Sequence, residues 1–159
     1  IFIKNGKKIA VINLIGRVDI AVLSENPFLK AKSIVEEISN KVDIIILDFH
    51  AEATAEKIAM GYYLDGKVTA VFGTHTHVQT ADEKILPNGT GYITDIGMTG
   101  PRNSVIGMNI GASIKRFETT LPERYKIAEG ECMFNSVMFE IDDKTNKVVK
   151  IERISKNAN

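Results

Sequence analysis

The first half of the chain alternates short apolar runs with amphipathic stretches. Residues 42–50 and 68–73 are nearly continuous apolar runs, a pattern typical of strands covered on both faces. Residues 25–41 and 51–67 carry apolar side chains at helical spacing, and Pro27 suits a first helical turn. The order strand, helix, strand, helix, strand predicts an α/β sheet layer.

Turn signals predict hairpins elsewhere in the chain. Asn5-Gly6 lies between apolar runs near the start, and residues 84–94 contain a second hairpin pattern. A long Gly-rich, Asn-rich and Thr-rich loop follows, and loops of this length are often functional. Residues 110–122 then predict a short helix, and apolar and polar positions alternate over residues 124–155. The second half is therefore expected to end in antiparallel strands.

The charge balance of the chain argues against partners that bind by electrostatics. The 159 residues include 20 Lys+Arg and 20 Asp+Glu, so the net charge is zero. This gives no strong signal for nucleic-acid binding and none for membrane attraction. The longest apolar stretch is far shorter than the roughly 20 residues that span a bilayer. With 44% hydrophobic residues, the chain can form one domain with a core.

The chain has a single cysteine, Cys132, which excludes an intrachain disulfide. A single cysteine fits a protein from a reducing compartment, and we expect a cytoplasmic location. Cys132 lies in a strand pattern, which predicts a buried and inert thiol.

All three histidines of the chain follow the ends of the two predicted buried strands. His50 ends the first strand, and His75 and His77 follow the second. The carboxyl ends of parallel strands meet at one edge of a sheet, where α/β proteins bind ligands. In an extended segment, residues two apart point the same way, so His75 and His77 are expected to face one site. Imidazole binds transition metals well, and the pattern predicts a metal site.

The residues alone leave the nature of this site open. Three histidines can form a complete catalytic metal site, or part of a larger one whose carboxylates come from elsewhere. A lone histidine at a strand end is also commonly structural. Acidic residues near the same loops are candidates for orienting the ligands: Asp48, Glu52, Asp82 and Asp95.

The loop from Gly97 to Pro101, followed by Arg102, offers a further candidate site. Its backbone N–H groups together with Arg102 suit an anion. A turn-rich loop with no ligand explains the same residues and is the preferred interpretation.

A long segment of the chain carries a family resemblance. The string DFHAEATAEKIAMGYYLDGKVTAVFGTHTHVQTADEKILPNGTGYITDIGMTGPRNSVIGM resembles the YmdB-like family of bacterial metallophosphoesterases, in the calcineurin-like superfamily. The resemblance implies an α/β fold with two β-layers flanked by helices. It also implies a two-metal centre, usually of iron or manganese with zinc possible, that hydrolyses phosphodiesters such as 2′,3′-cyclic nucleotides.

The resemblance also implies roles for individual residues. The segment GTHTH corresponds to the Gly-His-x-His motif of the superfamily, with Thr74 as an extra residue. By this resemblance His50 and His75 ligate one metal and His77 ligates the other. From their position, we expect further residues to line a substrate pocket: Thr74, Asp95, Gly97, Thr99 and Gly100.

The chain departs from the family pattern because the family's N-terminal motifs are absent from it. These motifs supply the bridging carboxylate and the histidine proton donor, so no catalytic residue is assigned here. We therefore expect residues 1–159 to be the C-terminal portion of a single metallophosphoesterase domain, with the N-terminal part missing. Such a chain is expected to take a small phosphodiester substrate and to be able to form a homo-oligomer. The alternatives are an inactive metal-binding or interaction module and a mononuclear three-histidine hydrolase.

Overall fold

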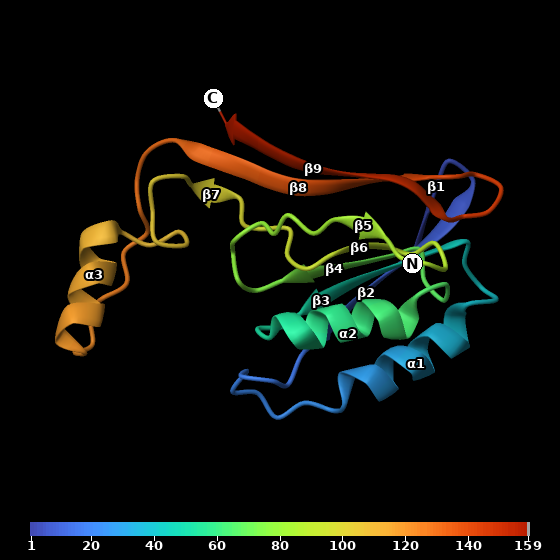
Figure 1. Ribbon diagram of the computed structural model, residues 1–159, viewed down its shortest axis with the longest axis horizontal. Helices are drawn as coiled ribbons and strands as arrows, with labels where there is room; N and C mark the ends of the chain where they lie inside the picture. The colour runs from blue at the N-terminus through green and yellow to red at the C-terminus, as the bar shows by residue number, and fades with distance from the viewer. Residues whose placement is uncertain (159) are drawn as a thin grey trace.

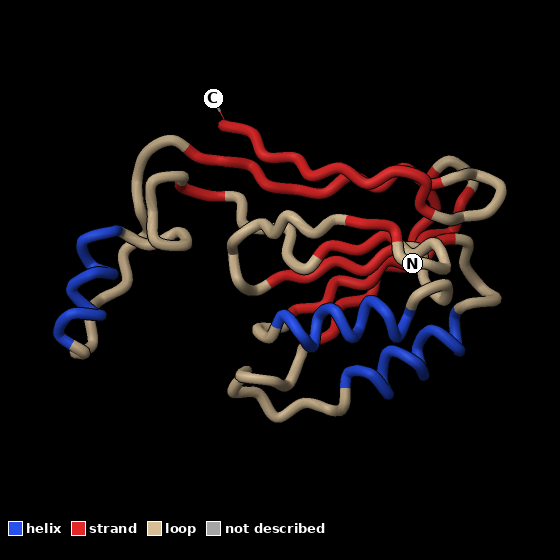
Figure 2. The backbone as a smooth tube through the Cα atoms, viewed as in Figure 1, coloured by secondary structure: helices blue, strands red, loops and turns tan. Residues whose placement is uncertain are grey.

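The computed structural model describes residues 1–158, which form two β-layers with helices beneath one of them (Figures 1 and 2). The first sheet has six strands in the order β1-β2-β3-β4-β6-β5, and the second has three in the order β7-β8-β9. The strands of the first sheet are β1 (Phe2–Lys4), β2 (Lys7–Ile15), β3 (Ile44–His50), β4 (Ala70–Thr74), β5 (Lys84–Ile85) and β6 (Gly91–Ile93). The strands of the second sheet are β7 (Gly100–Pro101), β8 (Cys132–Ile141) and β9 (Val148–Ala158).

The first sheet is parallel at its centre and antiparallel at its two edges. Strands β2, β3, β4 and β6 pair in parallel, while β1 and β5 each form a hairpin with a neighbouring strand. Both predicted hairpins and the predicted α/β layer are confirmed. The parallel register brings the carboxyl ends of β3 and β4 together, with His50 opposite Thr74.

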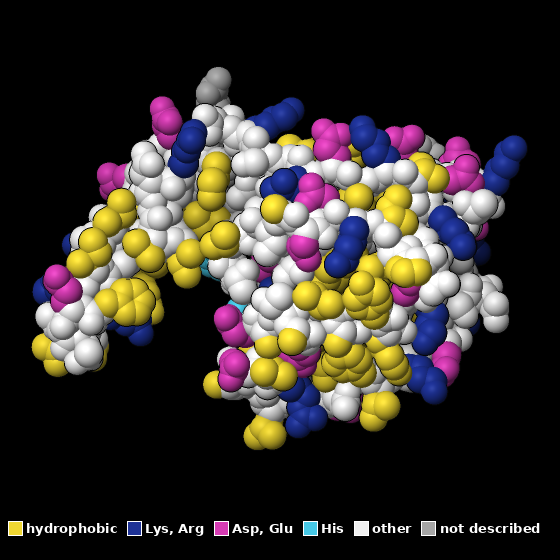
Figure 3. Space-filling model, in the orientation of Figure 1, with side chains coloured by type: hydrophobic (Ala, Val, Ile, Leu, Met, Phe, Trp, Pro, Cys, Tyr) yellow, Lys and Arg dark blue, Asp and Glu magenta, His cyan; other side chains and the backbone are white. Residues whose placement is uncertain are grey.

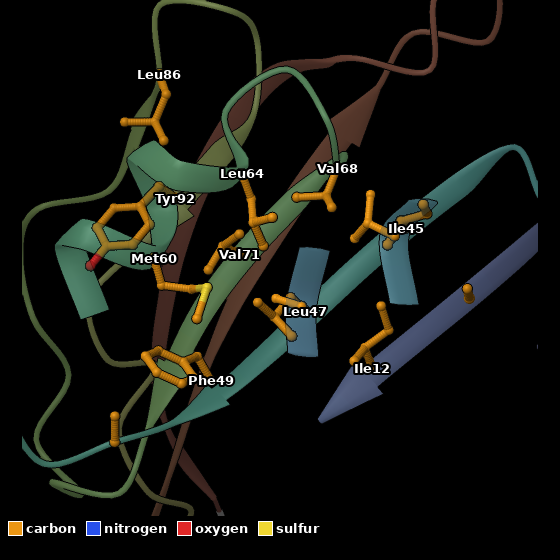
Figure 4. Close-up of a cluster of buried hydrophobic side chains, with 14 residues drawn as sticks. Ile12, Ile45, Leu47, Phe49, Met60, Leu64, Val68, Val71, Leu86 and Tyr92 are labelled. Carbon is orange, nitrogen blue, oxygen red and sulfur yellow. The ribbon is translucent and has the colours of Figure 1, made fainter. Parts of the chain in front are cut away.

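Two helices cover the lower face of this sheet in Figure 1: α1 (Pro27–Ile38) and α2 (Thr54–Leu64). Helix α1 begins where the Asn26 side chain accepts two backbone N–H groups, a common way to cap a helix. The core between helices and sheet is drawn in Figure 4, and its fully buried members include Leu47, Phe49, Met60, Leu64 and Val71.

Strand β3 is covered less completely than its apolar sequence predicts. Leu47 and Phe49 are buried against the helices, but Asp48 and His50 point to the other face and are only half-buried. The second sheet lies over the β5–β6 side of the first sheet and not over this part of β3 (Figure 1). The polar end of β3 is therefore accessible.

The second sheet packs closely on β6 because Gly91 has no side chain. A Cβ atom at Gly91 would lie 2.8 Å from the Phe139 ring and 3.0 Å from a methyl group of Val148. The antiparallel ending is confirmed for β8 and β9. Residues 124–130, also expected to be extended, instead form a loop with one isolated bridge between Met108 and Ile127.

The prediction that Cys132 is buried is wrong. Cys132 is the first residue of β8, and its thiol is exposed. Figure 1 shows this end of β8 beside β7, beyond the end of the first sheet. The alternating pattern identified the strand but not the exposure of its first residue.

Helix α3 (Ile110–Thr119) stands apart from both sheets, and none of its residues is buried. We call residues 105–128 the α3 lobe. A space-filling view shows a hollow between this lobe and the rest of the molecule, with histidine atoms at its back (Figure 3). None of the helices within residues 1–158 is long and apolar enough to cross a membrane.

Candidate metal centre

His50 and His75 meet at the edge of the sheet where β3 and β4 end. The Nε2 atom of His50 lies 3.0 Å from the Nδ1 atom of His75. Their ring centres are 4.8 Å apart, and the ring planes are nearly perpendicular at 89°. The prediction that the two strand ends bring these histidines together is confirmed.

The other ring nitrogen of His50 is held by a chain of polar side chains. Its Nδ1 atom lies 3.0 Å from the Thr74 hydroxyl, which in turn donates to Asp48 Oδ1 at 2.8 Å. The second oxygen of Asp48 accepts the Asn13 side-chain amide at 2.8 Å. The expected proximity of Asp48 and Thr74 to the histidines is therefore observed, and Asn13 extends the chain of contacts to β2.

His75 has a carboxylate on its far side. The Nε2 atom of His75 lies 2.9 Å from Glu52 Oε2, and both side chains are partly exposed. Glu52 was expected near this site because it follows β3 by two residues. The contact orients the ring, and it leaves the Nδ1 atom facing His50.

His77 does not share the arrangement of the other two histidines. Strand β4 ends at Thr74, and the backbone has φ values of 112° at His75 and 67° at His77. The expectation of an extended Thr-His-Thr-His segment is therefore wrong, because two left-handed residues turn the chain. The Nδ1 atom of His77 instead lies 3.0 Å from the carbonyl oxygen of Ile106, in the α3 lobe. Within residues 1–158 no group of three or more His, Cys, Asp or Glu side chains is arranged to hold an ion.

Ile106 is itself in a rare conformation. It has a φ of 46° in a tight turn with Gly107, closed by mutual hydrogen bonds between Val105 and Met108. A β-branched residue seldom adopts this region because its side chain clashes with the backbone. This strained turn presents the carbonyl that His77 contacts.

The turn between the histidines is tied to a buried carboxylate. Asp95 follows β6 and accepts hydrogen bonds from the Thr76 backbone N–H (3.0 Å), the Thr76 hydroxyl (2.7 Å) and the Gly97 N–H (2.9 Å). It also pairs with Lys57 of α2 at 2.8 Å, with both side chains only 1% exposed. Asp95 was a candidate for lining a substrate pocket, but it is fully buried and holds the backbone of the site instead.

These contacts also shift the pKa of Asp95. Burial alone raises the pKa of this carboxyl group, but hydrogen bonds from Lys57, Thr76 and Gly97 outweigh burial and lower the pKa below that of a free aspartate. The same balance operates at Asp82. Burial raises the pKa of this carboxyl group, but hydrogen bonds from Thr80 and Thr94 outweigh burial, so the pKa is lowered overall. Asp82 thus joins the segment after the histidine turn to Thr94, directly after β6.

The remaining candidate residues belong to the loop after Asp95. Gly97 packs against Gln79 with a φ of 76°, Thr99 is exposed, and Gly100 begins β7. In the described structure, no hydrogen bond joins any of the three to a histidine. Their role as pocket-lining residues stays a prediction.

Sequence reasoning missed three parts of this site. Lys57 gave a usable signal, because a charged residue lies on the inner, apolar side of a predicted helix. Asn13 gave a weaker signal as a polar residue in a strand. The carbonyl of Ile106 gave none, because a backbone acceptor from a distant loop leaves no trace in the sequence.

Comparisons with known proteins agree with the fold and with the family resemblance. Residues 1–154 match the family described as YmdB-like protein. A Bacillus subtilis relative, 2′,3′-cyclic-nucleotide 2′-phosphodiesterase, is 55% identical over 150 residues, which cover 94% of this chain and 56% of the relative. This chain therefore spans little more than half the length of that protein.

Two solved structures share the fold. A hypothetical protein from Thermus thermophilus superimposes with a TM-score of 0.92 at 35% identity, over 99% of this chain and 61% of its own. A novel phosphatase from Mycoplasma pneumoniae gives a TM-score of 0.90 at 42% identity, over 98% of this chain and 56% of its own. The predicted fold class and family resemblance are confirmed.

We predict that Gly73→Ala destabilises the chain strongly. A Cβ atom at Gly73 would lie 1.8 Å from the backbone oxygen of Thr94, so β4 and the segment after β6 would have to separate. The expected loss in the free energy of unfolding is about 3 kcal/mol or more, measured by urea denaturation. Gly100→Ala is the control, because no atom lies within 4 Å of its Cβ position. Equal stability of the two variants would contradict this account.

We predict that Lys57→Met costs about 3–5 kcal/mol, because it leaves the buried Asp95 charge without its cation. Lys32→Met serves as the control. Lys32 pairs with Glu36 at 3.9 Å with more than half of its side chain exposed, and its loss is expected to change stability by less than about 0.5 kcal/mol. Denaturant unfolding of both variants measures the difference. A small effect of Lys57→Met would show that the buried pair does not hold the structure together.

We predict that acid destabilises the protein in part through Asp95. Because the folded-state pKa of Asp95 lies below its unfolded-state pKa, its contribution is present above the unfolded-state pKa and is lost as the pH falls through the folded-state pKa. Below the unfolded-state pKa, the free energy of unfolding should therefore decline less steeply in Asp95→Asn than in the wild type. Parallel pH profiles for the two proteins would argue against this linkage.

Proposed function

The chain belongs to the YmdB-like family, and from this premise we propose that it supplies histidine ligands to a metal centre that hydrolyses phosphodiester bonds. The relative with 55% identity is a 2′,3′-cyclic-nucleotide 2′-phosphodiesterase, so we propose the same substrate class here. Two divalent transition-metal ions are the proposed cofactors. The observation that carries the proposal is the pair of imidazole nitrogens 3.0 Å apart at the end of β3 and β4.

The two rings fit an ion as a shared partner. Two imidazole nitrogens that each lie about 2.0–2.1 Å from one ion are separated by about 3.0 Å when they bind at a right angle. The Nε2 atom of His50 and the Nδ1 atom of His75 have this separation. Imidazole ligands suit iron, manganese and zinc better than magnesium, which agrees with the expected metals.

His77 is the proposed ligand of the second ion. A backbone carbonyl only accepts hydrogen bonds, so the Nδ1 atom of His77 donates to Ile106 and the Nε2 atom keeps a free lone pair. This ring therefore also offers a nitrogen to a metal, but away from the other two rings. The arrangement favours a two-metal centre over a mononuclear three-histidine site. A complete centre would need ligands in addition to the three histidines.

In this proposal the chain positions the reaction. Bound ions would supply Lewis-acid activation of water and of the phosphate. His50, held by Thr74, and His75, held by Glu52, keep their nitrogens at one point on the rim of the sheet. Asp95 fixes the turn that separates His75 from His77. Four points stay predictions: the identity of the metals, a cytoplasmic location, the oligomeric state, and the assignment of residues 1–159 to one incomplete domain.

We predict that His75→Ala lowers the metal content by at least one ion and removes turnover. The protein to assay is a chimaera in which this chain replaces the matched segment of the Bacillus subtilis relative, alongside the chain alone. Elemental analysis measures the metal, and hydrolysis of 2′,3′-cyclic AMP and bis-para-nitrophenyl phosphate measures activity. Loss of a ligand should lower turnover by more than about 100-fold, beyond the effect of losing a residue that only orients a ligand.

Tyr125→Phe in the exposed α3 lobe is the control for this assay, and it should keep metal and activity. Two metals and turnover in the chimaera, with turnover and at least one metal lost in His75→Ala, support the proposal. Metal binding without turnover in the chimaera would indicate an inactive binding module. One metal per chain with turnover in the short chain would indicate a mononuclear hydrolase, and an active His75→Ala chimaera would overturn the role of this histidine.

A further inference from the structure

We propose that Thr74 and Asp48 are positioning residues that fix the tautomer of His50, so that its Nε2 atom is the one presented to a metal. This inference rests on the proposed function for its purpose, but its geometry is independent of any metal. The argument uses the register of the sheet, the hydrogen-bonding capacity of each group and the direction of each contact.

The register of β3 and β4 places the three side chains together. Asp48 and His50 are two residues apart on β3, so both project from the same face. Thr74 is the register partner of His50 and lies diagonally across from Asp48, whose own partner is Phe72. Thr74 can therefore contact both side chains at once, at 3.0 Å and 2.8 Å.

The direction of the hydrogen bonds is fixed from the carboxylate end. An ionised carboxylate only accepts, so the one proton of the Thr74 hydroxyl is donated to Asp48. The hydroxyl oxygen can then only accept from His50, which must carry a proton on Nδ1. A neutral imidazole with its proton on Nδ1 keeps a lone pair on Nε2. That lone pair points at the position shared with His75.

Asn13 secures the carboxylate from the other side. Its amide donates to Asp48 Oδ2 at 2.8 Å, and Asn13 is the register partner of Asp48 on β2. Each oxygen of Asp48 thus has one donor, from a different neighbouring strand. The carboxylate is held across three parallel strands, so the tautomer of His50 follows from the register of the sheet.

A threonine is suited to this position because the chain needs one donor and one acceptor. Valine has the same shape without the hydroxyl, and its presence would leave the Nδ1 atom of His50 without a partner and its tautomer unfixed. Serine keeps the hydroxyl. Thr74 thereby fixes the geometry of the ligand His50 through its hydroxyl group, without contacting the metal itself.

The test compares Thr74→Val with Thr74→Ser on the metal-free chain. Long-range proton–nitrogen NMR correlations report which nitrogen of His50 carries the proton. We expect the Nδ1–H tautomer in the wild type and in Thr74→Ser, and a shift towards Nε2–H in Thr74→Val. Calorimetric titration with Mn²⁺ should then show about 10- to 100-fold weaker binding in Thr74→Val and near-normal binding in Thr74→Ser.

Thr54→Val is the matched control, because Thr54 is an exposed threonine at the start of α2. It should leave both readouts unchanged, and thermal unfolding verifies that each variant is folded. If Thr74→Val keeps the Nδ1–H tautomer, or binds Mn²⁺ as tightly as a wild type that does bind it, the positioning role is wrong. If Thr74→Val does not fold, Asp48→Asn supplies the same test, since it removes the charge that directs the hydroxyl proton.

The two proposals fail in different ways. A wild type that shows the Nδ1–H tautomer and loses it in Thr74→Val supports the positioning role even if no Mn²⁺ binds. In that case the metal-centre proposal is the one that fails. Normal Mn²⁺ binding by every variant leaves the metal centre intact and overturns the positioning role.

Discussion

The buried ion pair between Lys57 and Asp95 is the interaction on which the rest of the structure depends. It joins α2, the end of β6 and the turn between His75 and His77, although each of these elements comes from a different part of the sequence. Burying two charges is expensive unless their other hydrogen-bonding groups are also satisfied. Here Thr76 and Gly97 complete the shell of Asp95, so the desolvation cost is offset by contacts that also define the site.

The site itself follows from the way parallel strands align. Their carboxyl ends meet at one edge, so a histidine at the end of β3 and another just past β4 come within hydrogen-bonding distance. The same alignment supplies Asp48, Thr74 and Asn13 as a connected set behind His50. One regular feature of the sheet therefore gives both the ligands and the groups that orient them.

The regular parts of the fold were predictable, and the irregular contacts were not. Apolar runs, helical spacing and turn residues identified the strands and helices, and strand order then located His50 and His75 on one rim. The sequence pattern predicts an extended segment at His75 and His77, whereas the structure has a left-handed turn there that is held by Asp95 from a distant segment. Cys132 was misjudged for a related reason, since strand alternation says which side a residue faces but not whether another layer lies there. Both errors concern tertiary contacts that local sequence patterns do not encode.

Helix α3 lies apart from the two sheets, so the two parts of the site differ in their stability towards local unfolding. A helix of ten residues with none buried gains little from packing, and isolated helices of this length are only marginally stable in water. The α3 lobe should therefore open by local unfolding at a much lower free energy than the β3–β4 core, and its amide hydrogens should exchange faster. His50 and His75 lie in the more stable part, while the carbonyl that holds His77 belongs to the lobe. Orientation of His77 is thus coupled to the folding equilibrium of a peripheral segment, and any contact that orders the lobe would also order that ring.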